Sequence, residues 1–444
     1  MNYLSSTVLV PVFLFLAACA AKNPVDASGP MTDEELMTQV QHNTFQYFWN
    51  GAEPVSGMAC ERIHLDGVYP DHDQTVVTSG GSGFGVMAIL VGIERGFITR
   101  QEGFERLEKI TGWLEKADRF HGMYPHWFYG ETGKVKPFSK KDDGGDIVES
   151  AFLFQGLLCV RQYFQEGNEQ EKALAARVDQ LWKAANWDFY RGEKKENVLF
   201  WHWSPNYEWD MNHRIQGWNE CLIAYILAAA SPTHAIPAEV YHEGWARNGE
   251  MTGGPTQYGL RLALKHNGSP NFGGPLFWAH YSFLGLDPRK LKDRYADYWE
   301  HNRHHALINY HYCVQNPKNF YGYGKNCWGL TASYSTRFYA GHRPEEDFGV
   351  ISPTAALASM PYTPEESKAA MRHFYEKLGA SLWAKYGFYD AFSEHVDWFP
   401  RRYLAIDQGP IVVMIENYRT GLLWDLFMSC PEVQEGLTKL GFEF

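Results

Sequence analysis

The sequence predicts an all-α protein in which pairs of helices close into a ring, an (α/α)6 toroid. Two observations support this fold class. Nearly every segment after residue 31 has helical periodicity, and small, apolar helices alternate with amphipathic, charged ones. Loops rich in Gly and aromatic residues separate about six such pairs. A ring would enclose the apolar helices and leave the charged helices facing water.

The first expected helix, residues 32–49, is amphipathic and has no partner beside it in the sequence. We therefore expect it to pack against the end of the chain. The next two pairs are residues 82–94 with 100–117, and 146–164 with 169–187. In both pairs the first helix is almost wholly apolar and the second has a charged face, which predicts an enclosed helix followed by an outer one.

The second half of the chain repeats this plan less regularly. Its expected pairs are residues 216–230 with 236–247, 277–284 with 288–304, and 352–360 with 363–378. The last of these is the clearest, because Ser352 and Pro353 suit a helix start and Pro361 a helix end. Residues 407–428 are the last expected buried helix.

The composition narrows the class of protein. Of 444 residues, 16% are aromatic, 45% hydrophobic and 21% charged, which indicates a large core and excludes disorder. A net charge of −12 argues against binding to nucleic acid or to an anionic membrane surface. The surplus of Trp and Tyr suits either stacking on sugar rings or a densely packed aromatic core. We expect a monomer.

The N-terminal segment has the pattern of a lipoprotein signal. Residues 7–18 are an apolar run too short to span a bilayer, and Leu16-Ala17-Ala18-Cys19 looks like a lipobox. The region before the run departs from the pattern because it has no Lys or Arg. We expect residues 1–18 to be a signal peptide, 19–31 a tether lipidated at Cys19, and 32–444 one catalytic domain. The expected location is the periplasmic side of the outer membrane or the cell surface, with membrane contact only through the lipid.

The six other cysteines have no metal-binding spacing. There is no CxxC and no Cys/His cluster along the chain, so we expect no zinc site and no cofactor. Cys313 and Cys327 lie in one loop-rich region and could form a disulfide, but the sequence leaves this open.

Acidic residues gather where loops meet the apolar helices. Asp142, Asp146 and Glu149 surround Gly144 and Gly145 at one junction. Asp146 and Glu149 have the spacing of a capping box, a structural role that leaves Asp142 and the two glycines unexplained.

Three further acids lie at or in other apolar helices. Glu220 is near the start of one, where interaction with the helix dipole is a sufficient structural reason for an acid. Asp407 is an expected helix cap, and Glu416 lies inside the same apolar helix, where a charge needs a partner.

Geometry favours a pair of acids from different helices. Glycoside hydrolysis needs two carboxyl groups on opposite sides of the scissile bond. Asp146 and Glu149 are one turn apart on one helix, so Glu220 facing their group is the better arrangement, with Asp407 in reserve. The sequence has no GxSxG, P-loop or HExxH motif. The run Ser79–Gly85 is Gly-rich but follows no strand pattern, so we expect it to serve helix packing.

Four segments together resemble a known family. They are TSGGSGFGVMAILVGIERG (78–96), GWNECLIAYILAAASPTH (217–234), YGFYDAF (386–392) and LAIDQGPIVVMIENYRTGLLW (404–424). The set resembles the bacterial glycoamylase-like proteins and, within them, glycoside hydrolase family 144, over residues 32–444. The resemblance implies a metal-free (α/α)6 enzyme that cleaves β-1,2-glucan with inversion and releases sophorose or longer sophorooligosaccharides. By motif position, the implied functional acids are Asp142, Asp146, Glu149 and Glu220.

We assign roles to these residues as a hypothesis. Glu220 is the general acid, and the group of Asp142, Asp146 and Glu149 positions or activates water. The residues expected to stack on glucose rings or bind hydroxyls are Trp127, Trp218, Tyr389, Trp398, His126 and Arg214, with Glu416 as a further substrate-binding candidate.

Two other functions remain open at this point. A non-catalytic sugar-binding lipoprotein would bind glycans without turnover. A polysaccharide lyase or sugar epimerase could occupy the same toroid, because fold does not determine function. The acidic charge of the chain disfavours a lyase that acts on anionic sugars.

Overall fold

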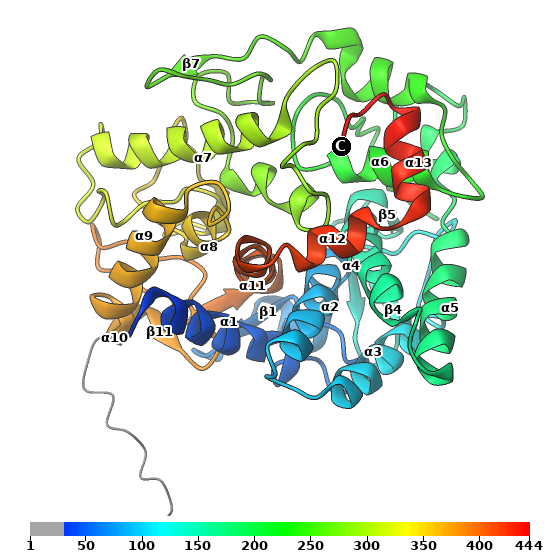
Figure 1. The fold of residues 1–444 in the computed structure, drawn as a ribbon, viewed down its shortest axis with the longest axis horizontal. Helices are drawn as coiled ribbons and strands as arrows, with labels where there is room; N and C mark the ends of the chain where they lie inside the picture. Colours follow the sequence, from blue (N-terminus) through cyan, green and yellow to red (C-terminus); the bar gives the residue numbers. More distant parts are fainter. Residues whose placement is uncertain (1–30) are drawn as a thin grey trace, which may run out of the picture.

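The computed structural model describes residues 31–444, apart from the side chains of residues 71 and 72, and it confirms the predicted helical ring (Figure 1). The expected signal peptide, tether and Cys19 lie outside the described residues. Within residues 31–444, no helix is long and apolar enough to cross a membrane.

The inner ring consists of largely buried helices. They are α2 (Ser79–Glu94), α4 (Ile147–Phe164), α6 (Leu222–Ala230), the 3-10 turns η5 (Leu276–Ala279) and η6 (Tyr281–Phe283), α8 (Pro353–Leu357) and α11 (Ala405–Arg419). Helix α11 packs against α2, α2 against α4, and α4 against α6, and α11 also contacts α8. Figure 1 shows α11 end-on near the middle of the molecule.

Each outer helix except α1 follows its inner partner in the chain. They are α1 (Asp33–Trp49), α3 (Arg100–Leu114), α5 (Glu169–Lys183), the π-helical turn η3 (Val240–Trp245), α7 (Tyr298–Gln315) and α9 (Pro364–Glu376). Helix α1 packs against α11, so the predicted pairing of the first helix with the end of the chain is confirmed. The remaining helical elements are η1 (Pro70–Thr75), η2 (Trp187–Arg191), η4 (Arg247–Gly249), α10 (Gly379–Leu382), α12 (Leu422–Met428) and α13 (Pro431–Lys439).

Short antiparallel strands shape the loops at one end of the ring. They are β1 (Arg62–His64) with β13 (Arg402–Leu404), β2 (Val76–Thr78) with β3 (Trp127–Tyr129) and β4 (Lys134–Lys136), β5 (Gly145–Asp146) with β6 (His202–Trp203), β7 (Thr256–Gln257) with β8 (Leu260–Arg261), β9 (Ala332–Tyr334) with β10 (Tyr339–Gly341), and β11 (Trp383–Ala384) with β12 (Gly387–Phe388).

Several predicted boundaries are wrong for local reasons. Helix α6 starts at Leu222 rather than 216, because Gly217 has a left-handed φ of 76° and interrupts the helix. Residues 288–297 are not helical; Asp293 accepts backbone hydrogen bonds that form a turn, and α7 begins only after its cap, Asp297. The helix expected over 407–428 is broken at Gly421, whose φ of 78° separates α11 from α12.

Glycines bring α2 and α4 into close contact. A Cβ atom on Gly83 would lie 2.2 Å from the carbonyl oxygen of Phe152, and one on Gly156 would lie 2.1 Å from the carbonyl oxygen of Gly83. The two backbones therefore touch where only glycine fits. This confirms that the Gly-rich run 79–85 serves helix packing.

Candidate active site

A cavity of about 390 Å³ opens where four inner helices begin. Thr78 precedes α2, Glu149 lies in the first turn of α4, Glu220 comes just before α6, and Leu404 precedes α11. The other lining residues are Glu61, Arg62, His126, Trp127, Phe138, Phe152, Trp201, Phe277, Tyr281, Tyr334, Tyr339 and Ile406. The helix starts thus place two of the predicted acids, Glu149 and Glu220, around one space.

Glu149 is held at the junction of α4 and α2. Its Oε2 accepts a hydrogen bond of 2.8 Å from the backbone N–H of Gly80, and its Oε1 lies 3.8 Å from Nε2 of His126. Burial raises the pKa of Glu149 to about 7, with the His126 cation opposing this shift and Asp146 adding to it. The carboxyl group can therefore exchange a proton near neutral pH.

Asp146 caps α4 and orients a histidine. Its Oδ1 accepts hydrogen bonds of 2.9 Å from the backbone N–H groups of Val148 and Glu149, which confirms the predicted cap. Its Oδ2 lies 3.3 Å from Nδ1 of His126. Burial opposes ionisation, but His126 and His202 hold the pKa of Asp146 well below its usual value. Asp146 is fully buried behind His126 and does not line the cavity.

His126 bridges the capping aspartate and the cavity. Burial disfavours its cation, but Glu149 and Asp146 outweigh burial and raise the pKa of His126 to about 10. The ring is therefore an imidazolium at neutral pH. This positive charge lies between two carboxylates, one of which faces the cavity.

Asp142 does not line the cavity and is connected to Asp146 through His202. Nε2 of His202 is 3.2 Å from Oδ2 of Asp142 and 3.5 Å from Oδ2 of Asp146. Burial disfavours the His202 cation, but these two carboxylates raise the pKa of His202 to about 9. The predicted acidic group is therefore a charge network in which Glu149 is the member that reaches the cavity.

Glu220 faces the same cavity from another helix pair. Burial raises the pKa of Glu220 to about 7, and the negative charges of Glu149 and Asp146 add to the effect. Its backbone carbonyl accepts a hydrogen bond from the hydroxyl of Ser282, which fixes the segment before α6. A carboxyl group of this kind is protonated in a large fraction of molecules near neutral pH.

Asp407 belongs to a buried pair beneath the cavity. Its Oδ1 accepts a hydrogen bond of 3.3 Å from the hydroxyl of Tyr281, a lining residue. Burial and the neighbouring carboxyl group of Asp390 raise the pKa of Asp407 well above its usual value, and burial raises the pKa of Asp390 to about 6. Two adjacent buried carboxyl groups share a proton in this way. Asp407 therefore supports the cavity floor rather than facing substrate.

Aromatic side chains cover much of the cavity wall. Trp127 packs against two cations, with Cζ of Arg62 at 5.3 Å and Nζ of Lys136 at 4.9 Å from its ring centroid. Phe138 packs at 4.7 Å from Trp127 and is 49% exposed. Flat apolar faces beside carboxyl groups suit a sugar ring, which has an apolar face and a hydroxylated edge.

Four predicted substrate-binding residues lie elsewhere. Trp218 is 0% exposed and packs against Trp245 and other core side chains, so the predicted stacking role conflicts with its position. The guanidinium of Arg214 forms an ion pair of 2.9 Å with Glu196 away from the cavity. Tyr389 is buried, Trp398 is half-buried, and both lie outside the cavity lining.

Glu416 is a structural residue. It forms two hydrogen bonds of 2.7 and 2.8 Å with Arg95 and accepts a further bond of 3.1 Å from Gln41. It therefore has the partners that a buried charge needs, and it ties α1 and the end of α2 to α11. It does not line the cavity, so its predicted role in substrate binding conflicts with its position.

Sequence reasoning missed several cavity residues. Glu61 and Arg62 come from the segment that enters β1, and Tyr334 and Tyr339 come from the β9–β10 hairpin. None lies in a periodic or motif-bearing stretch. The only available signal was the local density of aromatic residues in 332–341.

Two clusters among residues 31–444 have ligand atoms close enough for a metal ion. His126, Asp142 and Asp146 form one, and Cys327, His373 and Glu394 form the other. In the first cluster the histidine forms ion pairs with Asp146 and Glu149, and a metal ion would have to displace its proton. All six cysteines in the described residues, including Cys313 and Cys327, are free and buried.

The helical ring and the carboxyl groups that meet in an aromatic-lined cavity have the features expected of a glycoside hydrolase, and the relatives named below belong to that class. A model of the glycoamylase family, described as "Putative glucoamylase", matches residues 212–431. The chain is 66% identical to an endo-β-1,2-glucanase from Chitinophaga pinensis whose structure was solved with sophorotriose and glucose, covering 94% of this chain and 99% of that one at a TM-score of 0.92. The chain belongs to the bacterial glycoamylase-like proteins of glycoside hydrolase family 144, as the resemblance predicted.

Two other relatives are less similar to the chain in sequence. The chain is 48% identical to an exo-β-1,2-glucooligosaccharide sophorohydrolase (non-reducing end) from Parabacteroides distasonis, over 93% of this chain but only 58% of that protein. An endo-β-1,2-glucanase mutant from Talaromyces funiculosus, solved with β-1,2-glucan, is 10% identical at a TM-score of 0.66, which shows a shared fold alone.

Proposed function

We propose that the protein hydrolyses β-1,2-glucan by general acid–base catalysis with carboxyl groups. The observation that carries this proposal is the pair Glu149 and Glu220, which start from different inner helices, line one cavity, and each have a pKa of about 7. A pKa near the working pH suits a group that must give or take a proton. The names of the relatives support the β-1,2 linkage.

Glu220 acts as the acid in this proposal. Its proton passes to the glycosidic oxygen as the bond from that oxygen to the anomeric carbon breaks. Burial and two nearby negative charges raise the pKa of Glu220 to about 7, so a large fraction of molecules carry the proton near neutral pH. Asp407, the reserve candidate, is less suited because Tyr281 separates it from the cavity.

Glu149 acts as the base and takes a proton from the attacking water. The N–H of Gly80 and the imidazolium of His126 favour its charged form, so it ionises more readily than burial alone would allow. Asp146 and, through His202, Asp142 hold this arrangement and are positioning residues. Water attacks the anomeric carbon opposite the leaving oxygen, which inverts its configuration.

A variant pair tests the acid. Glu220→Gln keeps the shape of the side chain and removes its proton, so we expect folded protein with at least about 100-fold lower kcat on linear β-1,2-glucan. Glu108→Gln, on the exposed face of α3, is the matched control and should keep full activity. Circular dichroism checks folding. Activity of Glu220→Gln within a few-fold of wild type would exclude Glu220 as the acid.

A test of whether the enzyme attacks within the glucan chain or at its ends needs a different substrate. We infer attack within the chain, because the relative covered over 99% of its length is named an endo-glucanase. Cyclic β-1,2-glucan has no ends, so an endo enzyme should open it to sophorooligosaccharides. Chromatography of samples taken over time measures these products. Cleavage of linear glucan alone would indicate exo attack, and turnover of neither would refute the proposed function. Inversion is tested by NMR that identifies the anomer of the first product released, which should have the α configuration.

We also propose that Cys19 carries a lipid that anchors the protein to a membrane. The lipobox-like sequence Leu16-Ala17-Ala18-Cys19 supports this. The full chain expressed in a bacterium should enter the membrane fraction and take up radiolabelled palmitate. Cys19→Ser should abolish both, and labelling that survives this substitution would contradict the proposal.

A further inference from the structure

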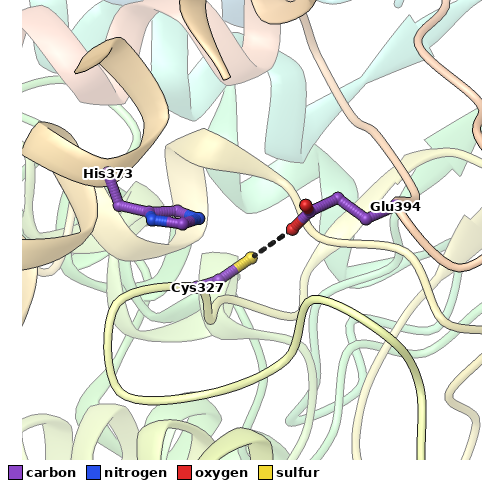
Figure 2. A group of neighbouring side chains, drawn as sticks. All are labelled: Cys327, His373 and Glu394. Atoms are coloured by element: carbon purple, nitrogen blue, oxygen red, sulfur yellow. Dashed lines mark hydrogen bonds between the residues drawn. The ribbon is translucent and has the colours of Figure 1, made fainter. Parts of the chain in front are cut away.

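A second cluster of reactive side chains lies away from the cavity. Cys327, His373 and Glu394 place their ligand atoms within 4.8 Å of one another, and none of them lines the cavity. Figure 2 shows the imidazole edge of His373 turned toward the thiol and the carboxylate. Sγ of Cys327 donates a hydrogen bond of 3.8 Å to Oε1 of Glu394. The proposed hydrolysis uses none of these groups.

The cluster contains a buried nitrogen without a partner. Nε2 of His373 makes no hydrogen bond in the described structure, and an unpaired buried polar atom costs free energy. A neutral imidazole has one ring nitrogen with a lone pair that can bind a cation. Cys327 is 2% exposed. A cation bound to Nε2 would give this nitrogen a partner.

Three segments hold the cluster in place. His373 lies on α9, and Nε1 of Trp328, next to Cys327, donates a hydrogen bond of 3.2 Å to the carbonyl of Glu366 on the same helix. Gly322 leaves room for the carboxylate, because a Cβ there would lie 2.4 Å from Oε1 of Glu394. These contacts keep the three segments close together before any ligand binds.

We propose that Cys327, His373 and Glu394 form a Zn²⁺ site. A thiolate, an imidazole and a carboxylate are the ligands that zinc takes, whereas Mg²⁺ and Ca²⁺ prefer oxygen alone. With Zn–S of about 2.3 Å and Zn–N and Zn–O of about 2.0 Å, tetrahedral ligands lie about 3.3–3.5 Å apart. The ligand atoms here lie within 4.8 Å of one another, so a contraction of about 1.5 Å or less brings them to these distances. Water completes the fourth position. This proposal goes beyond the proposed hydrolysis and does not depend on it.

Binding changes the protonation of the thiol. Burial and Glu394 raise the pKa of Cys327 well above its usual value, so without a cation the thiol keeps its proton. When Zn²⁺ binds, the S–H bond breaks, the sulfur electron pair forms the Zn–S bond, and the proton passes to solvent. The bound ion would then join α9 to the loops that carry Cys327 and Glu394, away from the cavity.

Metal binding is measured directly on the full chain. After treatment with EDTA and its removal, we expect calorimetry to show one Zn²⁺ per chain, and Co²⁺ to give the near-ultraviolet absorption of a cobalt–thiolate bond. Cys327→Ser and His373→Gln should each weaken Zn²⁺ binding by more than about 100-fold, above the loss caused by removing an outer-shell partner. The partly exposed His373 keeps the test valid if Cys327→Ser does not fold.

Two control variants define what would overturn the site. Cys313→Ser changes another buried free cysteine, and His126→Gln changes the other candidate cluster; both should keep one Zn²⁺ per chain. No Zn²⁺ uptake, unchanged binding in both Cys327→Ser and His373→Gln, or loss in His126→Gln alone would each refute the proposal. Hydrolysis of β-1,2-glucan is assayed separately, so failure of one proposal leaves the other standing.

Discussion

Charge at the level of single residues decides what the cavity can do. His126 is a cation wedged between Asp146 and Glu149, with Nδ1 at 3.3 Å from one carboxylate and Nε2 at 3.8 Å from the other. Its charge lowers the pKa of Glu149, which burial alone would raise further. The sequence predicted all three residues, but it assigned His126 to substrate hydroxyls because sequence spacing does not reveal which side chains pair.

Substitution of His126 should therefore change the pH profile. His126→Gln removes the cation, the pKa of Glu149 rises, and the ascending limb of kcat/KM against pH should move up by about one pH unit, since one unit corresponds to about 1.4 kcal/mol of charge interaction. Activity at pH 6 should fall more than activity at pH 8. His234→Gln changes a half-buried histidine that does not line the cavity and is the control. An unshifted limb would contradict this role of His126.

Contacts between elements explain why the inner ring can form. Helices α2 and α4 approach through Gly83 and Gly156, at a distance that admits no side chain. The apolar character of these helices was readable from the sequence, and so was the packing role of the glycines. The start of α6 and the limits of α7 were not, because Gly217 and the Asp293 turn act through backbone conformation that periodicity does not record.

A glycine pair tests this packing. Alanine favours a helix over glycine by about 0.5–1 kcal/mol, but at Gly83 its Cβ would meet the backbone of Phe152, which cannot move aside as a side chain would. We expect Gly83→Ala to lower the free energy of unfolding by about 1–3 kcal/mol in urea titrations. Gly112→Ala on α3, where nothing lies within 4 Å, should instead raise it slightly. Equal effects at the two sites would contradict this reading.

Across the whole molecule, the buried groups give stability a pH dependence. Burial raises the pKa of Glu149 and Glu220 to about 7 and that of Asp390 to about 6, so the folded state holds more protons than the unfolded state between about pH 4.5 and 7. The carboxylates raise the pKa of His126 to about 10 despite burial, which adds a loss of stability between pH 6.5 and 10. Buried histidines act in the opposite direction below about pH 6.5, because burial lowers the pKa of His280 to about 3 and that of His305 and His342 to about 4. Above that pH these rings are neutral in both states, and the loss of stability caused by the raised pKa of His126 remains.

The free energy of unfolding should therefore fall as the pH rises from 7 to 9. Urea titrations at pH 7, 8 and 9, with EDTA present to remove any bound metal, measure this change. His126→Gln should flatten the dependence because the substituted group no longer titrates. Greater stability at pH 9 than at pH 7 would contradict the raised pKa of His126.

The sequence by itself determined the alternation of inner and outer helices, the cap at Asp146, the packing role of the Gly-rich run and two of the three acids that line the cavity, Glu149 and Glu220. These features are local, since periodicity, capping and helix starts depend on neighbouring residues. Only the tertiary structure decided that Trp218 belongs to the core and that Glu61 and Tyr339 line the cavity. It alone brought Cys327, His373 and Glu394 together, because irregular loops place distant residues side by side through packing that leaves no period in the sequence.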